Sequence, residues 1–164
     1  MNHVYLSLGS NRGSRENNLA TAIKLLEEKA GKQIKASSVY ETAPWNMNDP
    51  MAFLNQVILL DTELSAFILM DVILKAEESM GRVRSGKAGY EPRIIDIDIL
   101  FFNNDVLETD SLIIPHPQIE RRRFVLEPLA EIAPEYIHPL LKRSVARLLI
   151  DCPDSLYVKK FVIK

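Results

Sequence analysis

The segment 94–102 constrains the fold of this chain more than any other, because branched and charged residues alternate along it. Isoleucine stands at positions 95, 97 and 99, and aspartate at positions 96 and 98. A period of two is typical of a β-strand, in which successive side chains point to opposite faces of a sheet. The pattern predicts a strand that buries its isoleucines and places Asp96 and Asp98 on one face, roughly 6–7 Å apart.

The rest of the chain predicts the order strand, helix, strand, strand, helix, strand. Strands are expected at about 4–8, 33–43, 54–60 and 94–102, and helices after Ser14 and Ser65. A hairpin partner near Leu107, partly helical segments and a last edge strand are expected at about 107, 118–133, 143–150 and 156–163. This order favours an α+β ferredoxin-like sandwich, an antiparallel sheet with helices packed on one face, plus a C-terminal extension.

The composition is that of a globular protein. The 164 residues are 47% hydrophobic and show no repeat or linker, so we expect a single domain over 1–164. No apolar run reaches about 18 residues, so we expect no membrane span. Residues 1–4 lack the start of a secretory signal, which favours a cytoplasmic protein. The net charge of −2 disfavours non-specific coating of nucleic acid.

The two aspartates are candidate metal ligands. Hard oxygen ligands suit Mg²⁺, which usually takes one or two carboxylates together with substrate phosphates. Aspartate is disfavoured in strands, so a pair of them in an isoleucine-rich strand needs a reason. The alternative is a solvated strand face, and the strand alone leaves both interpretations open.

Basic residues gather on both sides of this strand. Arg82, Arg84, Lys87 and Arg93 fall within twelve residues just before the aspartates, and residues 121–123 are all arginine. The planar guanidinium matches the oxygens of a phosphate. For any single arginine a salt-bridged surface is the better interpretation, but their concentration beside two carboxylates favours a polyphosphate–metal site.

Other polar residues stand beside aromatics. Thr42, Trp45, Phe53 and Asn55 flank one loop and would suit a flat heterocycle with amide-like edges. Without further information we favour the alternative, an asparagine that ends a strand and aromatics that cap the core. His116, between two prolines, could contact a phosphate or fill a turn. Glu77 lies near the end of the second expected helix, and its position favours a solvated or salt-bridged side chain over a catalytic base.

Seven sequence motifs occur together in the order known from one enzyme family. They span about residues 4–135 and lie at 8–11, 40–44, 53–55, 81–84, 92–100, 114–117 and 122–129. On these motifs the chain resembles the 6-hydroxymethyl-7,8-dihydropterin pyrophosphokinases of folate biosynthesis. The resemblance implies the ferredoxin-like sandwich and the transfer of diphosphate from ATP to the hydroxymethyl oxygen of the reduced pterin, with release of AMP. It implies ATP and the pterin as partners, no nucleic acid or membrane, and favours a monomer.

The resemblance also implies residue roles. Asp96 and Asp98 would hold two Mg²⁺ ions that bridge the ATP phosphates, and with Arg82 and Arg93 they would form the catalytic set. The residues implied to line the pterin pocket are Thr42, Ala43, Trp45, Phe53, Asn55 and Phe124. The residues implied to bind ATP are Glu77, Arg84, Tyr90, Arg93, Ile99, His116 and Arg122. A glycine-containing loop at 84–91 would close over the substrates.

Three other classes of protein compete with this interpretation. An RNA-binding module on the same fold would need a basic sheet with exposed aromatics, whereas the fourth expected strand carries two aspartates. A two-metal nucleotidyl transferase or cyclase is chemically closer, and a requirement for the reduced pterin would separate it. A purely structural domain would not bind Mg²⁺ and ATP at all.

Overall fold

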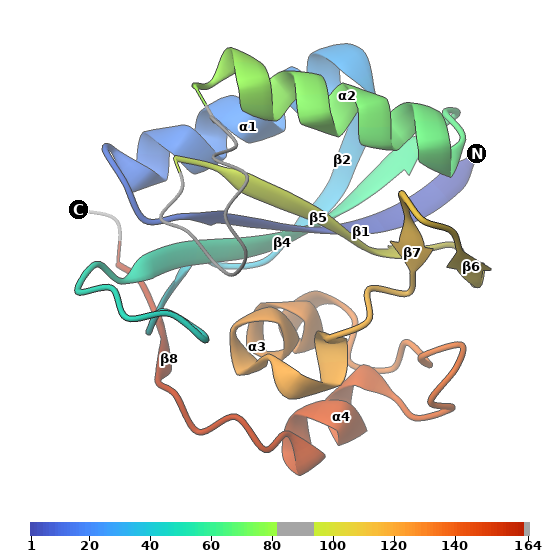
Figure 1. Cartoon of the computed structure of the whole chain (residues 1–164). Helices are drawn as coiled ribbons and strands as arrows, with labels where there is room; N and C mark the ends of the chain where they lie inside the picture. The colour runs from blue at the N-terminus through green and yellow to red at the C-terminus, as the bar shows by residue number, and fades with distance from the viewer. Residues whose placement is uncertain (82–93, 163–164) are drawn as a thin grey trace.

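The computed structural model describes residues 1–81 and 94–162 and is built around one antiparallel sheet (Figure 1). Five strands follow the order β5-β1-β4-β3-β8, and β2 pairs with β4 as well. These strands are β1 (Asn2–Ser10), β2 (Gly31–Ala36), β3 (Tyr40–Thr42), β4 (Phe53–Thr62), β5 (Asp96–Phe102) and β8 (Val158–Lys160). A separate hairpin is formed by β6 (Leu107–Glu108) and β7 (Ile113–Ile114).

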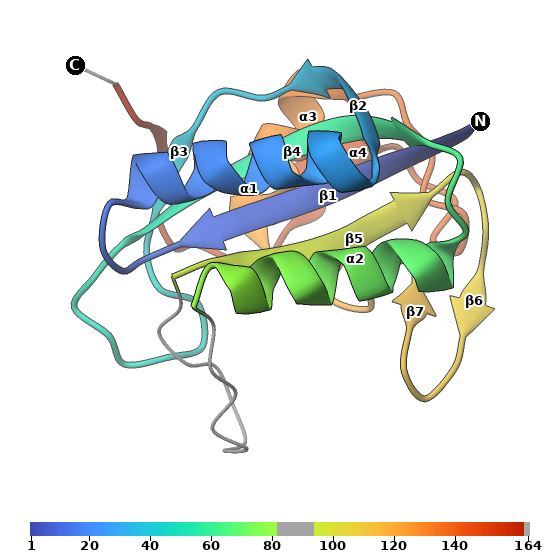
Figure 2. The ribbon, with the colours of Figure 1, turned by 90° about the horizontal axis from the view of Figure 1, so that it is seen from above.

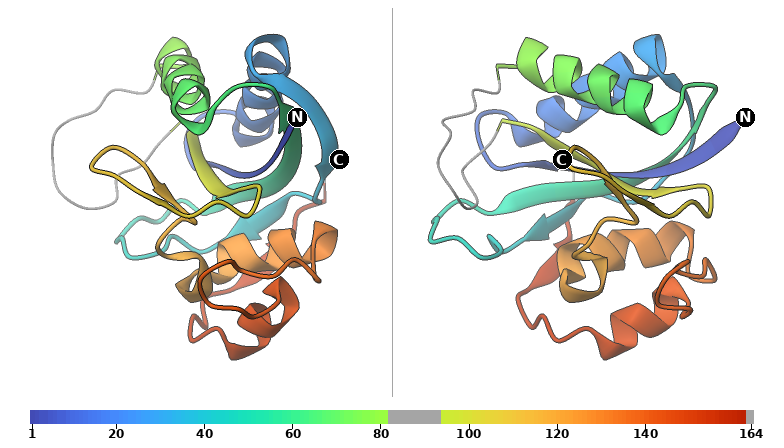
Figure 3. Two further views of the ribbon diagram at one scale, coloured as in Figure 1. Left: turned by 90° about the vertical axis from the view of Figure 1, so that its right-hand side faces the viewer. Right: turned by 45° about the vertical axis from the view of Figure 1, so that its right-hand side comes forward.

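Helices cover both faces of the sheet (Figure 3). They are α1 (Arg15–Lys29), α2 (Ala66–Ser79), the 3₁₀ turn η1 (Ile119–Arg121), α3 (Arg123–Ile132) and α4 (Val145–Asp151). The helices α1 and α2 lie across one face, as the view in Figure 2 shows, while α3 and α4 lie against the other. The expectation of helices on one face is therefore wrong for the chain as a whole.

The two layers of helices account for two hydrophobic cores. Under α1 and α2 the core includes Leu6 and Leu8 of β1 together with Ile97 and Ile99 of β5. Under α3 and α4 the core includes Phe101 and its buried neighbours from those helices. The run 99–102 is buried throughout because both faces of β5 are covered at that end. The predicted alternation of core isoleucines with aspartates along β5 is confirmed.

Most predicted elements form, with shifted limits. Ser65 caps α2, since its side chain accepts a hydrogen bond from the backbone N–H of Ile68. Ser14 occupies the equivalent position before α1 but makes no such bond. The single strand expected at 33–43 is two strands, because the Ser37 hydroxyl accepts the N–H of Val57 where the ladder to β4 is interrupted. No helix within the described ranges is long and apolar enough to cross a membrane.

A histidine organises the connection between α3 and α4. His138 is 3% exposed, and its Nδ1 accepts the backbone N–H groups of Leu140 at 3.1 Å and Leu141 at 3.0 Å. These bonds need an unprotonated Nδ1. Burial lowers the pKa of His138, Arg143 acts in the same direction, and Glu120 opposes the shift.

The pKa of His138 predicts a loss of stability in mild acid. The folded pKa lies below the ordinary value of 6.5, so the unfolded chain binds the proton first. Stability is therefore full above pH 6.5 and falls as the pH drops below it. In His138→Asn the asparagine Oδ1 can accept the same N–H groups but does not titrate. We therefore expect this variant to lose less stability as the pH falls. Urea unfolding at pH 7.5 and 5.5 compares the two proteins, and an equal loss in both would contradict the assignment.

Candidate active site

A pocket opens where β1 ends and its neighbours β4 and β5 begin. Gly9 of β1 pairs with Asn55 on one side and with Asp96 on the other, and Ser7 pairs with Asp98. All five residues line the pocket. Because Ser7 and Gly9 carry little or no side chain, β1 forms a low floor between the amide on β4 and the carboxylates on β5.

Three further segments complete the pocket wall. They are the end of β3, the loop 43–52, and the first turn of α3. The lining residues outside the floor, the amide and the carboxylates are Thr42, Ala43, Trp45, Met47, Phe53, Arg122 and Phe124. All six residues that the resemblance implies around the pterin thus line the same pocket as the two aspartates.

The amide of Asn55 is held from two sides. Its Nδ2 donates to Thr42 Oγ1 at 2.5 Å, and the two residues are 4% and 1% exposed. On the other side, a Cβ added to Gly9 would lie 2.6 Å from Asn55 Oδ1. The absence of a side chain at Gly9 therefore leaves the space that the amide oxygen occupies, and the hydroxyl of Thr42 fixes the opposite end of the group.

Arg122 closes the pocket opposite the sheet. Its guanidinium carbon lies 4.8 Å from the centre of the Trp45 ring and 5.7 Å from that of Phe124. The two rings are themselves 6.3 Å apart. A cation against aromatic faces is favourable, the more so when it is buried as Arg122 is. The cluster sets a positive charge and two aromatic surfaces beside each other at the pocket.

The loop 43–52 is tied to the turn that follows β1. Arg12 Nη2 donates to Asp49 Oδ2 at 2.8 Å, and Asn11 Nδ2 donates to the carbonyl of Met51 at 3.4 Å. A hydrogen bond from the N–H of Met51 and the contact with Arg12 lower the pKa of Asp49. These bonds hold the loop that carries Trp45 and Met47 over the pocket.

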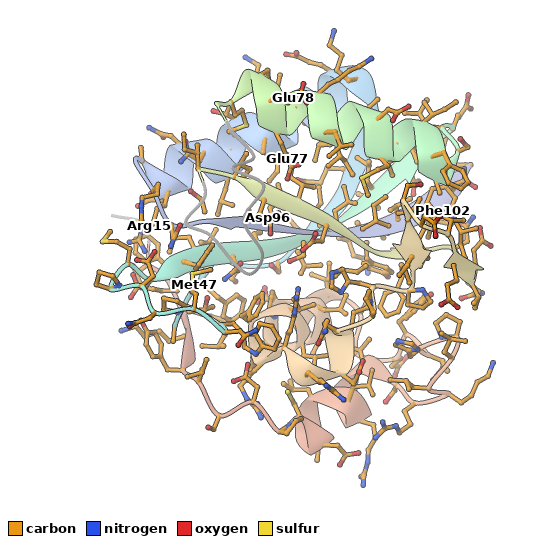
Figure 4. The ribbon with its side chains drawn as sticks, viewed as in Figure 1. Arg15, Met47, Glu77, Glu78, Asp96 and Phe102 are labelled. Atoms are coloured by element: carbon orange, nitrogen blue, oxygen red, sulfur yellow. The ribbon has the colours of Figure 1, made fainter. Side chains whose placement is uncertain are left out.

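Asp96 and Asp98 are the candidate metal ligands among the described residues. Figure 4 shows Asp96 on β5, with Met47 on the loop to one side of the strand and Glu77 on α2 to the other. No cluster of three or more histidines, cysteines or acidic residues that could hold a metal occurs within 1–81 and 94–162. Two carboxylates on one strand face fit Mg²⁺ that takes its other ligands from phosphates and water.

Glu77 differs from the expectation of a solvated residue. It is 2% exposed, and its Oε2 accepts the backbone N–H of Ile97 at 2.9 Å. Within the described part of the chain, β5 is an edge strand of the sheet. The N–H groups on its outer side therefore have no neighbouring strand to donate to. The carboxylate of Glu77 satisfies one of these groups between Asp96 and Asp98. Its side chain does not line the pocket.

His116 lies near the charged groups of the pocket. The ring Nδ1 of His116 accepts the backbone N–H of Gln118 at 3.2 Å, and the backbone N–H of His116 donates to the carbonyl of Leu100. Burial lowers the pKa of His116 to about 4, with Arg122 acting in the same direction and Asp96 in the opposite one. The ring is therefore neutral at pH 7, and with Nδ1 as acceptor it carries its proton on Nε2.

Some expected site residues do not reach the pocket. Ile99, implied to bind ATP, is 3% exposed in the core under α1 and α2, because it alternates with Asp98 and faces the other way. Among the three consecutive arginines, Arg121 is exposed and Arg123 bonds to Asp154, so only Arg122 lines the pocket. The remaining expected residues, Arg82, Arg84, Tyr90 and Arg93, lie outside the described residues.

Sequence reasoning missed three lining residues, Ser7, Gly9 and Met47. A signal for two of them is present in β1, where Ser7 and Gly9 are the small members of the face opposite Leu6 and Leu8. That alternation shows a strand but not which neighbours it pairs with. Met47 lies in a loop with no periodicity, and only the loop's contacts to the turn after β1 place it.

Comparisons with known proteins agree on one family. The sequence model described as 7,8-dihydro-6-hydroxymethylpterin-pyrophosphokinase (HPPK) matches residues 5–134. A Bacillus subtilis protein named 2-amino-4-hydroxy-6-hydroxymethyldihydropteridine pyrophosphokinase is 44% identical over 134 residues, which are 80% of this chain and 79% of that protein. A folic acid synthesis protein of Dictyostelium discoideum is 39% identical over 94% of this chain, which spans only 23% of that protein.

Solved structures of the same kind share the fold. A Plasmodium falciparum structure described as wild-type HPPK-DHPS superposes with a TM-score of 0.73 and covers 92% of this chain. The match spans 43% of that chain, and the two sequences are 22% identical. At this identity the likeness concerns the fold alone.

The close approach of Gly9 to Asn55 predicts a coupling between the two positions. Gly9→Ala should destabilise the protein by about 1–3 kcal/mol, because the new methyl group overlaps the amide oxygen. In an Asn55→Ala background the overlap is gone, and the same change should be neutral or slightly stabilising, since glycine is unfavourable in a strand. Urea unfolding of the four proteins measures the coupling. Equal costs in both backgrounds would show that the amide does not lie over Gly9.

Proposed function

Because this chain belongs to the 7,8-dihydro-6-hydroxymethylpterin-pyrophosphokinase family, we propose that it transfers diphosphate from ATP to 6-hydroxymethyl-7,8-dihydropterin, giving AMP and the pterin diphosphate. One observation carries the proposal. A single pocket joins a buried amide and hydroxyl with aromatic rings at one side to a pair of carboxylates at the other. The first end suits a flat heterocycle and the second suits a phosphate–metal complex.

The pterin would occupy the end formed by β3, β4 and the start of α3. The rings of Trp45, Phe53 and Phe124 offer faces for a planar substrate, and Asn55 and Thr42 offer donors and acceptors for its edge. A side-chain amide that hydrogen-bonds an edge discriminates strongly against ligands lacking the matching group. Ala43 would complete this side of the pocket.

The phosphates would lie at the β5 end. Asp96 and Asp98 would hold Mg²⁺, which when bound neutralises phosphate charge and polarises the transferred group. The guanidinium of Arg122, which lies against the aromatic rings and lines the same pocket as the carboxylates, would stabilise negative charge that grows during transfer. His116 can donate from Nε2 to a phosphate oxygen.

The residues position two substrates rather than form a covalent intermediate. The hydroxymethyl oxygen of the pterin would attack the β-phosphorus of ATP in line, and the bond from that phosphorus to the oxygen of the α-phosphate would break. AMP then leaves with that oxygen, and the proton of the hydroxymethyl group passes to water. Holding both substrates in one pocket makes the step effectively unimolecular, and the aromatic wall would exclude water that would otherwise hydrolyse ATP.

Several finer features belong to the same proposal. We propose two Mg²⁺ ions, a monomer, a single domain over 1–164 and the cytoplasm as the location. The ferredoxin-like description is supported by the order of the strands, with β1 and β4 central and the helices α1 and α2 between strands. The segment that follows β5 would then be the C-terminal extension, which contributes α3, α4 and β8.

The proposed reaction predicts AMP formation that depends on the pterin. ATP and Mg²⁺ are incubated with the protein, with and without 6-hydroxymethyl-7,8-dihydropterin, and nucleotides and pterins are separated by chromatography. We expect AMP and pterin diphosphate in equal amounts, and neither product without the pterin. AMP released at the same rate without the pterin would instead indicate ATP hydrolysis or a different acceptor.

The carboxylates are tested by substitution. Asp96→Ala and Asp98→Ala should each lower kcat about 100-fold or more, because phosphate charge is no longer neutralised. Titration calorimetry should show weaker binding of ATP in the presence of Mg²⁺. The exposed Asp110, in the turn between β6 and β7, provides a matched control in Asp110→Ala. Full activity of both site variants at saturating Mg²⁺ would refute the metal assignment.

Asn55 is tested at the other end of the pocket. Asn55→Ala should chiefly weaken binding of the pterin, because an edge hydrogen bond is lost, while binding of ATP should change little. Calorimetric titration of each substrate separates the two effects. An unchanged affinity for the pterin would remove Asn55 from the recognition of that substrate.

A further inference from the structure

We propose that Asp154, in the C-terminal segment beyond the residues matched by the family model, positions the pocket wall formed by the first turn of α3. The inference rests on the proposed function for its enzymatic consequence. The segment 152–160 contacts two separate parts of the pocket wall, the start of α3 and the end of β3. The segment 152–160 thereby connects the start of α3 to the end of β3.

The start of α3 lacks a cap of its own. The first N–H groups of a helix have no partner within it, and a nearby side-chain oxygen usually accepts one of them. Arg122 stands in the N-cap position and makes no side-chain cap. Instead Asp154, 31 residues further along the chain, accepts the N–H of Arg123 on Oδ2 at 3.1 Å. Its negative charge also suits the positive end of the helix dipole.

Arg123 binds the same segment in return. Its Nε donates to the carbonyl of Asp154 at 2.8 Å, and its Nη2 donates to the carbonyl of Cys152 at 3.4 Å. Asp154 Oδ1 accepts the N–H of Leu156 at 3.0 Å, which fixes the turn that presents the carboxylate. The contact is thus a set of bonds in both directions rather than a single exposed ion pair.

The segment then continues to the opposite wall. The carbonyl of Tyr157 accepts the N–H of Ala43 at 3.2 Å, and Val158 pairs with Thr42 at the edge of the sheet. Figure 1 shows this part of the chain running from α4 along the side of the molecule to β8. The segment therefore bridges the wall that carries Thr42 and Ala43 and the wall that carries α3.

The residues that the bridge fixes are pocket residues. Arg122 and Phe124 flank Arg123 in the chain and both line the pocket. A shift of this turn would move the guanidinium and one aromatic ring together, and would alter their contacts with Trp45. Asp154 itself does not line the pocket, so it would act through these residues as a positioning residue.

Asp151, the last residue of α4, provides a matched control just before the segment. Its carboxylate accepts hydrogen bonds as well, from the guanidinium groups of Arg143 at 3.0 Å and Arg147 at 3.2 Å. It lies three residues before Asp154, and neither Arg143 nor Arg147 lines the pocket. The experiment compares Asp154→Ala with Asp151→Ala and with the conservative Asp154→Asn, which keeps an oxygen acceptor for the N–H of Arg123.

The enzymatic readout is the KM for each substrate. In Asp154→Ala we expect the KM for the pterin to rise about tenfold, more than the KM for ATP, because the bridge joins the walls around the heterocycle. Asp154→Asn should recover part of the loss, and Asp151→Ala should match the unmodified protein. Equal rises for both substrates, or the same loss in Asp151→Ala, would overturn the assignment. So would an unchanged KM in Asp154→Ala.

A second readout needs no substrate. Trp45 is the only tryptophan of the chain and packs against Arg122 and Phe124, so its fluorescence reports the position of this turn. We expect acrylamide quenching of Trp45 to increase in Asp154→Ala but not in Asp151→Ala, at a temperature where circular dichroism shows all proteins folded. If the unmodified protein lacks pterin-dependent turnover, the proposed function fails, and quenching still decides whether Asp154 fixes the turn. Unchanged quenching in Asp154→Ala would refute that positioning.

Discussion

The antiparallel pairing of β1 with both β4 and β5 is the constraint on which the site depends. It sets Gly9 level with Asn55 on one neighbour and with Asp96 on the other. Because side chains alternate, all three face the same side once the isoleucines and leucines are buried under α1 and α2. A shift of the register by one residue would turn the carboxylates into the core, so the same burial that stabilises the sheet also orients the site.

The second layer of helices turns this sheet edge into a pocket. The helices α3 and α4 bury the far half of the face, where β5 carries Phe101. At the start of α3 this layer ends, and the pocket lies there. It is lined by the small residues of β1 and by Arg122 and Phe124. The same helix therefore serves two purposes. Its later residues pack in a hydrophobic core, and the residues at its start line the pocket.

Much of this arrangement could be predicted from the sequence, but unevenly. The strand with Asp96 and Asp98 was predictable because a period of two dictates which residues share a face. Glu77 was not, because a carboxylate near the end of a helix resembles a solvated one until the strand whose N–H it accepts is known. Ile99 shows a second limit, since the resemblance implies that it binds ATP while the alternation along β5 places its side chain in the core.

Most of the elements, the face on which the aspartates stand and the motifs that mark the family can be found in the amino-acid sequence alone. These are local properties, fixed by the spacing of side chains along a strand or a helix. Tertiary packing, in contrast, sets α3 and α4 against the second face and brings Asp154 to the start of a helix 31 residues away. Such contacts depend on which surfaces remain unburied after the sheet has formed, and no period in the sequence encodes that.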